Sequence, residues 1–190
     1  MEPGVKAAFL DRDGVINRDV GYIHRREDFL FLPGIFESCA HLQAAQYRLF
    51  VVTNQGGIAK GLFTESQMRA LHGWMEEQFL QRGIRIEKVY HCPHHPDGIH
   101  AELAGPCECR KPKPGMILSA QSEFGVDLRR SVLVGNRESD IEAGIAGGVG
   151  TTILVEEDTV APVTKASLVV RSVAELSGRI AELAAERVES

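Results

Sequence analysis

Two aspartates, Asp11 and Asp13, come directly after the short apolar run of residues 5–10 (VKAAFL) and are followed by Gly14. Carboxylates at this spacing can converge on one cation, which relieves their mutual repulsion, or they can share acid–base work. Asp and Gly are also ordinary turn residues, so an acidic turn without chemistry is the more common explanation for such a segment taken alone.

A second polar segment follows the apolar run that ends at Val52. It offers a hydroxyl, two carboxamides and flexible backbone N–H donors, from Thr53, Asn54, Gln55, Gly56 and Gly57. At the end of a strand these groups could cradle a phosphate or stabilise an oxyanion. A polar turn that leads into a helix is an equal alternative.

Cations follow in the segment RKPKPG, residues 110–115, where two prolines fix the backbone just before a predicted helix. Arg110 offers a bidentate fork and Lys111 a compact charge, and both suit a phosphoryl group. Lys113 is a weaker candidate, and the whole segment could be a solvated basic turn.

The fourth polar segment is GNRESD, residues 135–140, which follows the apolar run SVLV. Asp140 could be a further metal ligand or a hydrogen-bonding carboxylate. A turn that caps the next helix is the alternative without chemistry.

Three cysteines and a histidine form a pattern typical of a structural zinc site. Cys92 and His94 make one short pair, and Cys107 and Cys109 make another after twelve intervening residues. Three thiolates and one imidazole fill a closed tetrahedral site and leave no position for substrate. His94 is the better ligand by spacing, with His95 as the alternate. The remaining Cys39 lies in an amphipathic segment and is expected to be buried.

Composition sets the class of protein within which these residues act. Of the 190 residues, 44% are hydrophobic and 25% charged, as in an average globular domain, so we expect a single domain over residues 1–190. The balance of 21 basic and 26 acidic residues gives a net charge of −5, and no run of like charges suggests a surface for polyanions, which argues against a nucleic-acid partner. No apolar stretch approaches the ~20 residues that span a bilayer, and residues 1–6 lack a signal-peptide pattern. We therefore expect no membrane partner and a cytoplasmic location.

The elements that must position these side chains alternate between strand and helix periodicity. Strands are predicted at residues 5–10, 47–53, 84–91, 131–135, 151–155 and 168–170, and helices at 34–46, 64–82, 114–124, 139–146 and 173–187. Thr64 and Gln67 fit a capping box at the start of the second helix. This alternation predicts an α/β fold with a Rossmann-like parallel sheet and helices on both faces.

Parallel strands bring their carboxyl ends to one edge of the sheet, where ligands bind in such folds. The four polar segments therefore meet at that edge. The long irregular segment 92–113 is rich in Cys, His, Pro and Gly and needs something other than hydrophobic burial to hold it, which a bound metal would supply.

Along the chain, the polar segments supply a carboxylate pair, a hydroxyl, a lysine and a GNxxxD segment, in that order. This arrangement resembles the motif order of the haloacid dehalogenase-like (HAD) phosphohydrolase superfamily. Finer motifs are FLDRDGVIN (9–17), DVGY (19–22), VVTNQGGIAKG (51–61), CPHHPDG (92–98) and CECRKPKPGM (107–116). They resemble the heptose bisphosphate phosphatases, a capless family with a zinc-binding loop, here residues 92–109. Histidinol-phosphate phosphatases usually have a shorter zinc loop, so the twelve-residue gap favours the heptose family.

The resemblance implies a role for each motif residue. Asp11 would be the nucleophile that takes the phosphoryl group, and Asp13 the acid that protonates the leaving oxygen and then the base that activates water. Thr53 and Lys111 would stabilise the phosphoryl oxygens. Catalytic Mg²⁺ would be held by Asp11, the backbone carbonyl of Asp13, Asn136 and Asp140, while Zn²⁺ would be structural.

The implied substrate is a small sugar bisphosphate, D-glycero-D-manno-heptose 1,7-bisphosphate, from which the 7-phosphate is removed in nucleotide-activated heptose biosynthesis. The expected binding residues are Asp19, Val20, Gly21, Tyr22, Asn54, Gln55, Arg110 and Arg137. No segment is long enough for a cap domain, so the site should be open and the protein a monomer.

Asn136 departs from the superfamily, which usually has Asp at this position. An amide supplies an oxygen with one negative charge less, so we expect a raised magnesium requirement. Two alternatives stay open: a phosphatase for histidinol phosphate or another small sugar phosphate, and a non-catalytic phosphate-binding module if Asn136 disables the metal site. The sequence does not distinguish the anomers of the heptose.

Overall fold

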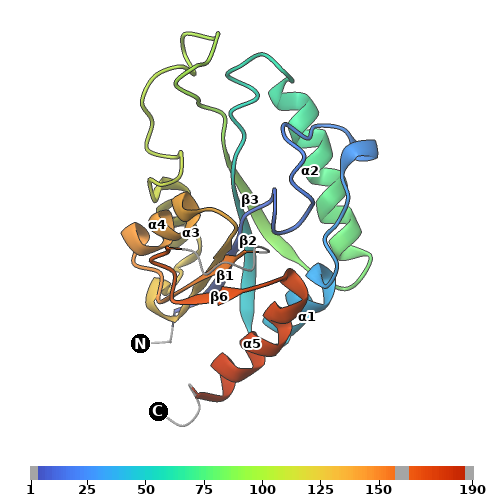
Figure 1. The fold of residues 1–190 in the computed structure, drawn as a ribbon, viewed down its shortest axis with the longest axis vertical. Coiled ribbons are helices and arrows are strands. Elements are labelled where there is room, and N and C mark those ends of the chain that lie inside the picture. Colours follow the sequence, from blue (N-terminus) through green and yellow to red (C-terminus); the bar gives the residue numbers. More distant parts are fainter. Residues whose placement is uncertain (1–3, 157–162, 187–190) are drawn as a thin grey trace.

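The computed structural model describes residues 4–156 and 163–186, which contain one six-stranded parallel sheet (Figure 1). The strand order is β3-β2-β1-β4-β5-β6. The strands are β1 (Lys6–Leu10), β2 (Tyr47–Asn54), β3 (Ile86–Cys92), β4 (Val132–Gly135), β5 (Thr151–Val155) and β6 (Leu168–Val170).

Five α-helices connect or follow the strands. They are α1 (Ile35–Ala44), α2 (Glu65–Leu80), α3 (Gly115–Phe124), α4 (Glu138–Gly147) and α5 (Val173–Glu186), with short 3₁₀ turns at Arg26–Asp28 and Leu128–Arg130. Thr64 caps α2 through the expected box with Gln67, which satisfies backbone donors that the first turn leaves free. Gly125 ends α3 in a left-handed conformation with φ 66°, which only glycine adopts at no steric cost.

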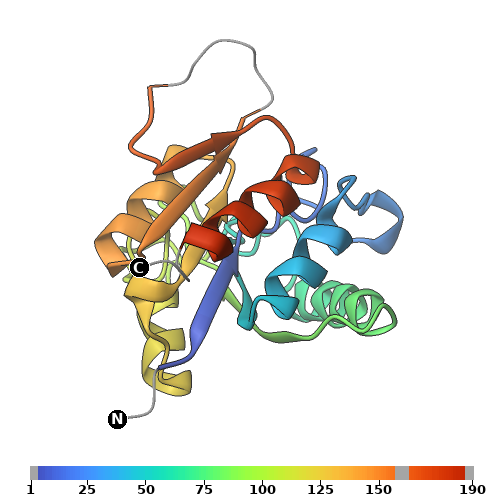
Figure 2. The same ribbon diagram turned by 90° about the horizontal axis from the view of Figure 1, so that it is seen from below.

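The helices form two layers on opposite faces of the sheet, as Figure 2 shows from below. Successive strand residues point to opposite faces, so Ala8 and Leu10 pack with α1, α2 and α5, whereas Ala7 and Phe9 pack with α3 and α4. Both faces of the central strands are therefore apolar and buried. Cys39 contributes to the first of these cores with no exposed surface, as its position in the sequence predicts.

The chain leaves β1 for β2 and β3 on one side and then returns to β4 on the other side of β1. This reversal parts the loops that follow β1 and β4 and opens a crevice at the carboxyl edge of the sheet. The long segment between β3 and α3 extends above the same edge (Figure 1). Residues 93–114 contain neither helix nor strand, one residue later at each end than the irregular segment 92–113 that the sequence predicts.

The sequence predicts each of these elements to within about two residues at most boundaries. Arg187, the predicted end of the last helix, lies outside the described residues, as do residues 1–3, 157–162 and 188–190. Among the described residues, no helix is long and apolar enough to cross a membrane.

Candidate active site

A cleft at the carboxyl edge of the sheet collects most of the side chains that the sequence singles out. It is lined by Asp11, Asp13, Asp19, Gly21, Tyr22, Thr53, Asn54, Gln55, Arg110, Lys111, Arg137 and Asp140, together with Gly56, Gly57, His95 and Ser139. Two predicted residues do not line it: Val20 is exposed to solvent, and Asn136 borders a neighbouring hollow that also includes Gly14. The four polar segments therefore meet, as the strand order requires.

Lys111 lies at the centre of this cleft between two buried carboxylates. Its Nζ is 2.8 Å from Oδ1 of Asp11 and 2.7 Å from Oδ1 of Asp140, and it also donates to the carbonyl of Val52 at 2.7 Å. The side chains of Lys111 and Asp140 are each 3% exposed, and that of Asp11 is 10% exposed. All three donors of the Lys111 ammonium are therefore used, by the loop after β1, by β2 and by the start of α4.

The charges in this cluster do not balance. Burial raises the pKa of Asp11 to about 7; the Lys111 charge acts in the opposite direction, and the Asp140 charge raises the pKa further. Burial alone would lower the pKa of Lys111, but the two carboxylates raise it above its usual value. A lysine that stays charged beside two carboxylates leaves one negative charge without a partner. A cation bound here would favour the ionised, nucleophilic form of Asp11.

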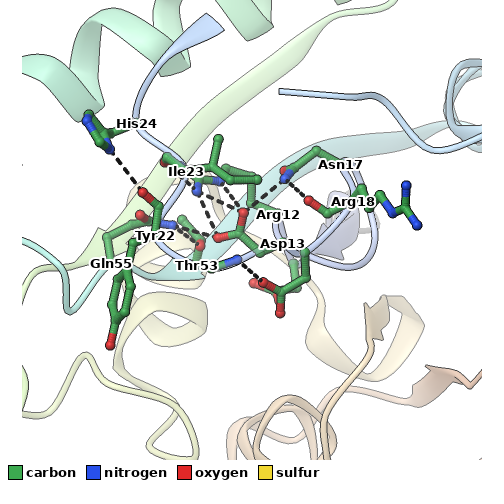
Figure 3. A network of polar contacts seen from close by, with 12 residues as sticks. Arg12, Asp13, Asn17, Arg18, Tyr22, Ile23, His24, Thr53 and Gln55 are labelled. Carbon is green, nitrogen blue, oxygen red and sulfur yellow. Dashed lines mark hydrogen bonds and ion pairs between the residues drawn. The ribbon is translucent and has the colours of Figure 1, made fainter. Parts of the chain in front are cut away.

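Asp13 lies beside Asp11 on the loop after β1 and accepts hydrogen bonds from three side chains (Figure 3). The guanidinium of Arg12 donates to both of its oxygens, at 2.8 Å each through Nη2. Asn17 Nδ2 donates to Oδ1 at 3.0 Å and Gln55 Nε2 to Oδ2 at 3.1 Å. The side chain of Asp13 remains 22% exposed, so it can reach a ligand in the cleft.

Gln55 connects the loops after β1 and β2. Besides Asp13, its Nε2 donates to the hydroxyl oxygen of Thr53 at 2.8 Å. Since that oxygen accepts from Gln55, the Thr53 O–H remains free to donate toward the cleft. Thr53 is buried, which suits a hydroxyl that must donate to one phosphoryl oxygen in a fixed direction.

Asn54 is committed to the backbone of Lys111. Its Nδ2 donates to the Lys111 carbonyl at 3.1 Å, and its Oδ1 accepts from the Lys111 N–H at 3.0 Å. The sequence suggests a role for Asn54 at the substrate rim. In the structure Asn54 lines the cleft, and its amide fixes the backbone of the residue that carries the central cation.

The segment after β4 combines a helix cap with a candidate metal ligand. Asp140 Oδ2 accepts from the backbone N–H groups of Asn136 and Arg137, at 3.2 and 3.0 Å, while its Oδ1 faces Lys111. Asp140 is therefore both part of the helix cap and a hydrogen-bonding carboxylate in the cleft, two of the roles that the sequence suggests. Asn136 packs against Gly14, where a Cβ atom would come within 2.0 Å of Asn136 Nδ2.

The residues of this corner fit a hard divalent cation. Oδ1 of Asn136 is buried and accepts no hydrogen bond, an arrangement that is costly unless something else binds the oxygen. It belongs to a loop that packs on the segment of Asp11 and Asp13, where negative charge is in excess. Carboxylate and amide oxygens are the ligands that Mg²⁺ prefers.

The rim of the cleft is held by pairs of polar residues. Arg137 and Asp19, both predicted to bind substrate, form an ion pair at 2.8 Å. The Tyr22 hydroxyl accepts from Lys60 at 2.9 Å. Arg110 donates from Nη1 to the carbonyl of His94 at 2.9 Å, which ties this arginine to the cysteine and histidine cluster. Of these residues, Asp19, Tyr22, Arg110 and Arg137 line the cleft.

The cysteine and histidine cluster has the geometry of a tetrahedral zinc site. Cys92, His94, Cys107 and Cys109 offer ligand atoms that all lie within 4.8 Å of one another. The Sγ atoms of Cys92 and Cys107 are 3.6 Å apart, and Nδ1 of His94 is 3.7 Å from Cys92 Sγ and 3.4 Å from Cys109 Sγ. Tetrahedral ligands at Zn–S about 2.3 Å and Zn–N about 2.0 Å lie about 3.5 to 3.8 Å apart. His94, rather than the alternate His95, completes this set.

Sequence reasoning missed three residues at the site. His95 and Ser139 line the cleft, and Arg12 holds Asp13 while having no exposed surface itself. Arg12 lies between the two aspartates in the sequence, and this position could have indicated a role at the site. Lys113, the weaker candidate, lies outside the cleft and pairs with Glu108 at 2.7 Å on the surface.

Comparison with known proteins finds relatives over most of the chain. A family model described as HAD-hyrolase-like matches residues 108–176. The chain is 46% identical over 164 residues to the D-glycero-beta-D-manno-heptose-1,7-bisphosphate 7-phosphatase of Yersinia pestis, covering 86% of each protein. It is 48% identical over 153 residues to the corresponding alpha-heptose enzyme of Campylobacter jejuni, covering 80% of this chain and 84% of that one.

A solved structure matches the fold and the length of the chain. It is the D,D-heptose 1,7-bisphosphate phosphatase from B. bronchiseptica complexed with magnesium and phosphate, with a TM-score of 0.80 and 28% sequence identity. The match covers 94% of this chain and 99% of that one.

Proposed function

The chain belongs to the heptose 1,7-bisphosphate 7-phosphatases of the HAD-like hydrolases, and on that basis we propose that it removes the 7-phosphate of D-glycero-D-manno-heptose 1,7-bisphosphate. The observation that carries the proposal is the cluster of Asp11, Lys111 and Asp140 beside Asp13 in one cleft. A phosphate ester needs a nucleophile, a cation and a proton donor, and this cleft offers all three within one small volume.

The first step transfers the phosphoryl group to the protein. An oxygen of Asp11 attacks phosphorus, the bond from phosphorus to the sugar oxygen breaks, and Asp13 gives its proton to that oxygen. The products are the heptose 1-phosphate, an aspartyl-phosphate on Asp11 and the anion of Asp13. Protonation of the leaving group matters because a sugar alkoxide is a poor leaving group at neutral pH.

The second step releases phosphate. Asp13, now a carboxylate, takes a proton from water while the water oxygen attacks phosphorus of the aspartyl-phosphate. The acyl phosphate bond breaks, phosphate leaves, and both aspartates return to their starting states. One pair of carboxylates therefore serves both halves of the reaction, and the division replaces one difficult displacement by two easier ones.

Lys111 and Thr53 stabilise the phosphoryl oxygens in both steps. The Lys111 Nζ is already 2.8 Å from Asp11, so a phosphoryl group on that aspartate stays next to the lysine charge. The Thr53 hydroxyl faces the same cleft and has its oxygen fixed by Gln55. Donors fixed before the reaction need not reorganise as charge spreads over the phosphoryl oxygens.

Magnesium is the cofactor that this donor set fits. Asp11, the carbonyl of Asp13, Asn136 and Asp140 would hold it; the unpartnered Oδ1 of Asn136 and the excess negative charge support this assignment. When bound, the ion would offset the repulsion between the Asp11 carboxylate and the incoming phosphate. The solved heptose bisphosphate phosphatase from B. bronchiseptica is described as complexed with magnesium and phosphate.

The second phosphate and the sugar meet the rim of the cleft. Arg110 and Arg137 offer guanidinium forks that suit a phosphate, and Asp19, Gly21, Tyr22 and Gln55 offer groups that suit sugar hydroxyls. Val20 would contribute through its backbone, since its side chain is exposed. We also propose that a single cytoplasmic domain acts as a monomer, without nucleic-acid or membrane partners, because the sequence has no segment for a cap domain, a net charge of −5 and no bilayer-spanning apolar stretch.

A structural zinc ion would hold the segment that carries Arg110 and Lys111. The four ligand atoms lie at distances that suit tetrahedral zinc, and Arg110 is hydrogen bonded to the carbonyl of one ligand residue. All four positions are filled by protein atoms, which leaves none for substrate. Zinc would therefore position the segment of Arg110 and Lys111 and take no part in the reaction itself.

The test is phosphate release from both anomers of the heptose bisphosphate, beside histidinol phosphate and fructose 1,6-bisphosphate, across a magnesium titration. Both anomers are needed because relatives named for each anomer match the chain about equally well. We expect fast release of one phosphate from one heptose anomer. Faster turnover of histidinol phosphate would show that the protein acts on that substrate instead. No phosphate release from any substrate at high magnesium would favour a phosphate-binding module.

A further inference from the structure

Arg12 has no exposed surface, and its volume is the largest of any completely buried side chain in the described residues. A buried guanidinium is costly unless its donors are paired, and here three partners surround it. Nη2 donates to both oxygens of Asp13 and to the carbonyl of Ile23 at 3.0 Å, as Figure 3 shows. The third partner is His72, whose Nε2 is 3.1 Å from Nη1 of Arg12.

His72 comes from α2, on the far side of the guanidinium from Asp13. It belongs to the buried stripe of that helix with Met68, Leu71, Met75 and Phe79, and is 4% exposed. A histidine in an apolar stripe is an exception to the helical pattern. It contributes a polar nitrogen at a place where packing alone would favour another apolar side chain.

The hydrogen bond between Arg12 and His72 fixes the state of the imidazole. Arginine has donors and no acceptor, so Nε2 of His72 must accept, and the ring must be neutral with its proton on Nδ1. Burial, followed by the Arg12 charge, lowers the pKa of His72 to about 3, which agrees with a neutral ring. His72 therefore acts as a fixed acceptor at neutral pH.

This arrangement links α2 to the carboxylate that the proposed reaction uses for proton transfer. We infer that His72 is a positioning residue that holds the Arg12 guanidinium, which in turn orients the Asp13 carboxylate toward the leaving oxygen. The inference rests on the proposed function, because it assumes that Asp13 is the acid and base. Asn17 and Gln55 also contact Asp13, but Arg12 is the partner that contacts both of its oxygens through charged donors.

Two kinds of substrate separate a positioning role from a general structural role. A sugar alkoxide needs a proton as it leaves, whereas p-nitrophenolate leaves near neutral pH without one. The ratio kcat/KM reports steps up to and including departure of the first leaving group. Loss of Asp13 orientation should therefore lower kcat/KM for the heptose bisphosphate and spare kcat/KM for p-nitrophenyl phosphate.

The experiment compares His72→Leu with His72→Gln in the full chain with magnesium and zinc. Leucine fills the site without an acceptor, whereas glutamine keeps an acceptor oxygen near the position of Nε2. We expect His72→Leu to lower kcat/KM for the heptose bisphosphate by about 10- to 100-fold. The value for p-nitrophenyl phosphate should stay within about 2-fold, and His72→Gln should recover most of the sugar activity. Urea unfolding of both variants checks that each is folded under assay conditions.

Other outcomes overturn the inference. Equal losses on the two substrates would mean that His72 only supports the fold, and unchanged sugar activity in His72→Leu would mean that Arg12 needs no such support. If glutamine fails to restore what leucine removes, the acceptor is not the relevant property. A parent protein that hydrolyses p-nitrophenyl phosphate but no sugar phosphate would overturn the proposed function and this inference together.

Discussion

The Nζ of Lys111 lies 2.8 Å from Oδ1 of Asp11, although the two residues are 100 positions apart in the chain. Three sets of contacts with other segments hold the lysine there. Asn54 binds its backbone on both sides, the carbonyl of Val52 accepts from its ammonium, and Asp140 faces it from the start of α4. The ends of β1 and β2, the zinc-binding segment and α4 are therefore joined at one cation, and removal of that cation should affect all of them.

Lys111→Met should lower both stability and activity. It leaves Asp11 and Asp140 buried without their shared counter-charge, and breaking such a buried pair costs about 3 to 5 kcal/mol. The expected result is a reduction of that size in the free energy of urea unfolding, together with a loss of phosphate release of about 100-fold or more.

Lys113→Met is the matched control for that variant. Lys113 pairs with Glu108 at 2.7 Å on the surface, outside the cleft, so its removal should change unfolding and turnover little. Equal effects of the two substitutions would contradict the central role of Lys111.

Asp11→Asn should abolish turnover while phosphate binding persists. The amide has nearly the same shape as the carboxylate but cannot form the aspartyl-phosphate, so kcat should fall by about 1,000-fold or more. Calorimetry with inorganic phosphate measures binding, and mass spectrometry after acid quench detects the phosphorylated parent. Turnover within about 10-fold of the parent would instead indicate direct attack by water.

Asn136→Asp should strengthen magnesium binding. The buried Oδ1 of Asn136 has no hydrogen-bond partner, and a carboxylate there adds the charge that Mg²⁺ prefers. Calorimetric titration of the zinc-loaded protein with Mg²⁺ should give a dissociation constant about 10-fold lower than that of the parent.

The same variant should be less stable than the parent when magnesium is removed. An additional carboxylate then lies in a corner where Asp11 already has a raised pKa. Thermal unfolding with and without Mg²⁺ should therefore show a larger stabilisation by the ion than in the parent. Identical magnesium affinities would show that Asn136 takes no part in the site.

Cys107→Ser combined with Cys109→Ser should remove the zinc site. Metal analysis should find about one zinc per parent chain and almost none in the variant. Arg110 is anchored on the carbonyl of His94, so its loss of position should raise KM for the bisphosphate. A metal-free variant with unchanged KM and kcat would exclude a positioning role for zinc.

The stability of the folded protein should fall in acid because of His72. Its folded pKa, about 3, lies below the ordinary value of 6.5, so between these limits the unfolded chain binds the extra proton. The contribution is complete above about pH 6.5 and is lost as the pH falls toward 3. Between pH 7.5 and 5.5 the parent should lose on the order of 1 kcal/mol more unfolding free energy than His72→Leu. Parallel losses in the two proteins would argue that His72 is not held neutral.

The helices, the strands and the metal cluster could be predicted from the sequence because they depend on short-range patterns. Alternation of period two marks the strands, and the Thr64 and Gln67 pair marks the start of α2. Cys92, His94, Cys107 and Cys109 were identified by spacing, since short clips place their ligands together whatever the surrounding path. The strand ends that carry the polar segments could be identified for the same reason.

The partner of each polar side chain, by contrast, depends on how the whole chain folds. Lys111 with Asp140, Arg12 with His72, and Arg137 with Asp19 are contacts between distant segments. They depend on the strand order and on the paths of loops, which local periodicity does not encode. Asn54 illustrates the difference: its place after a strand indicated a role at the site, but the role itself depends on where the chain brings Lys111 57 residues later. Burial then gives these contacts their energetic weight, because a paired charge inside the protein cannot exchange its partner for water.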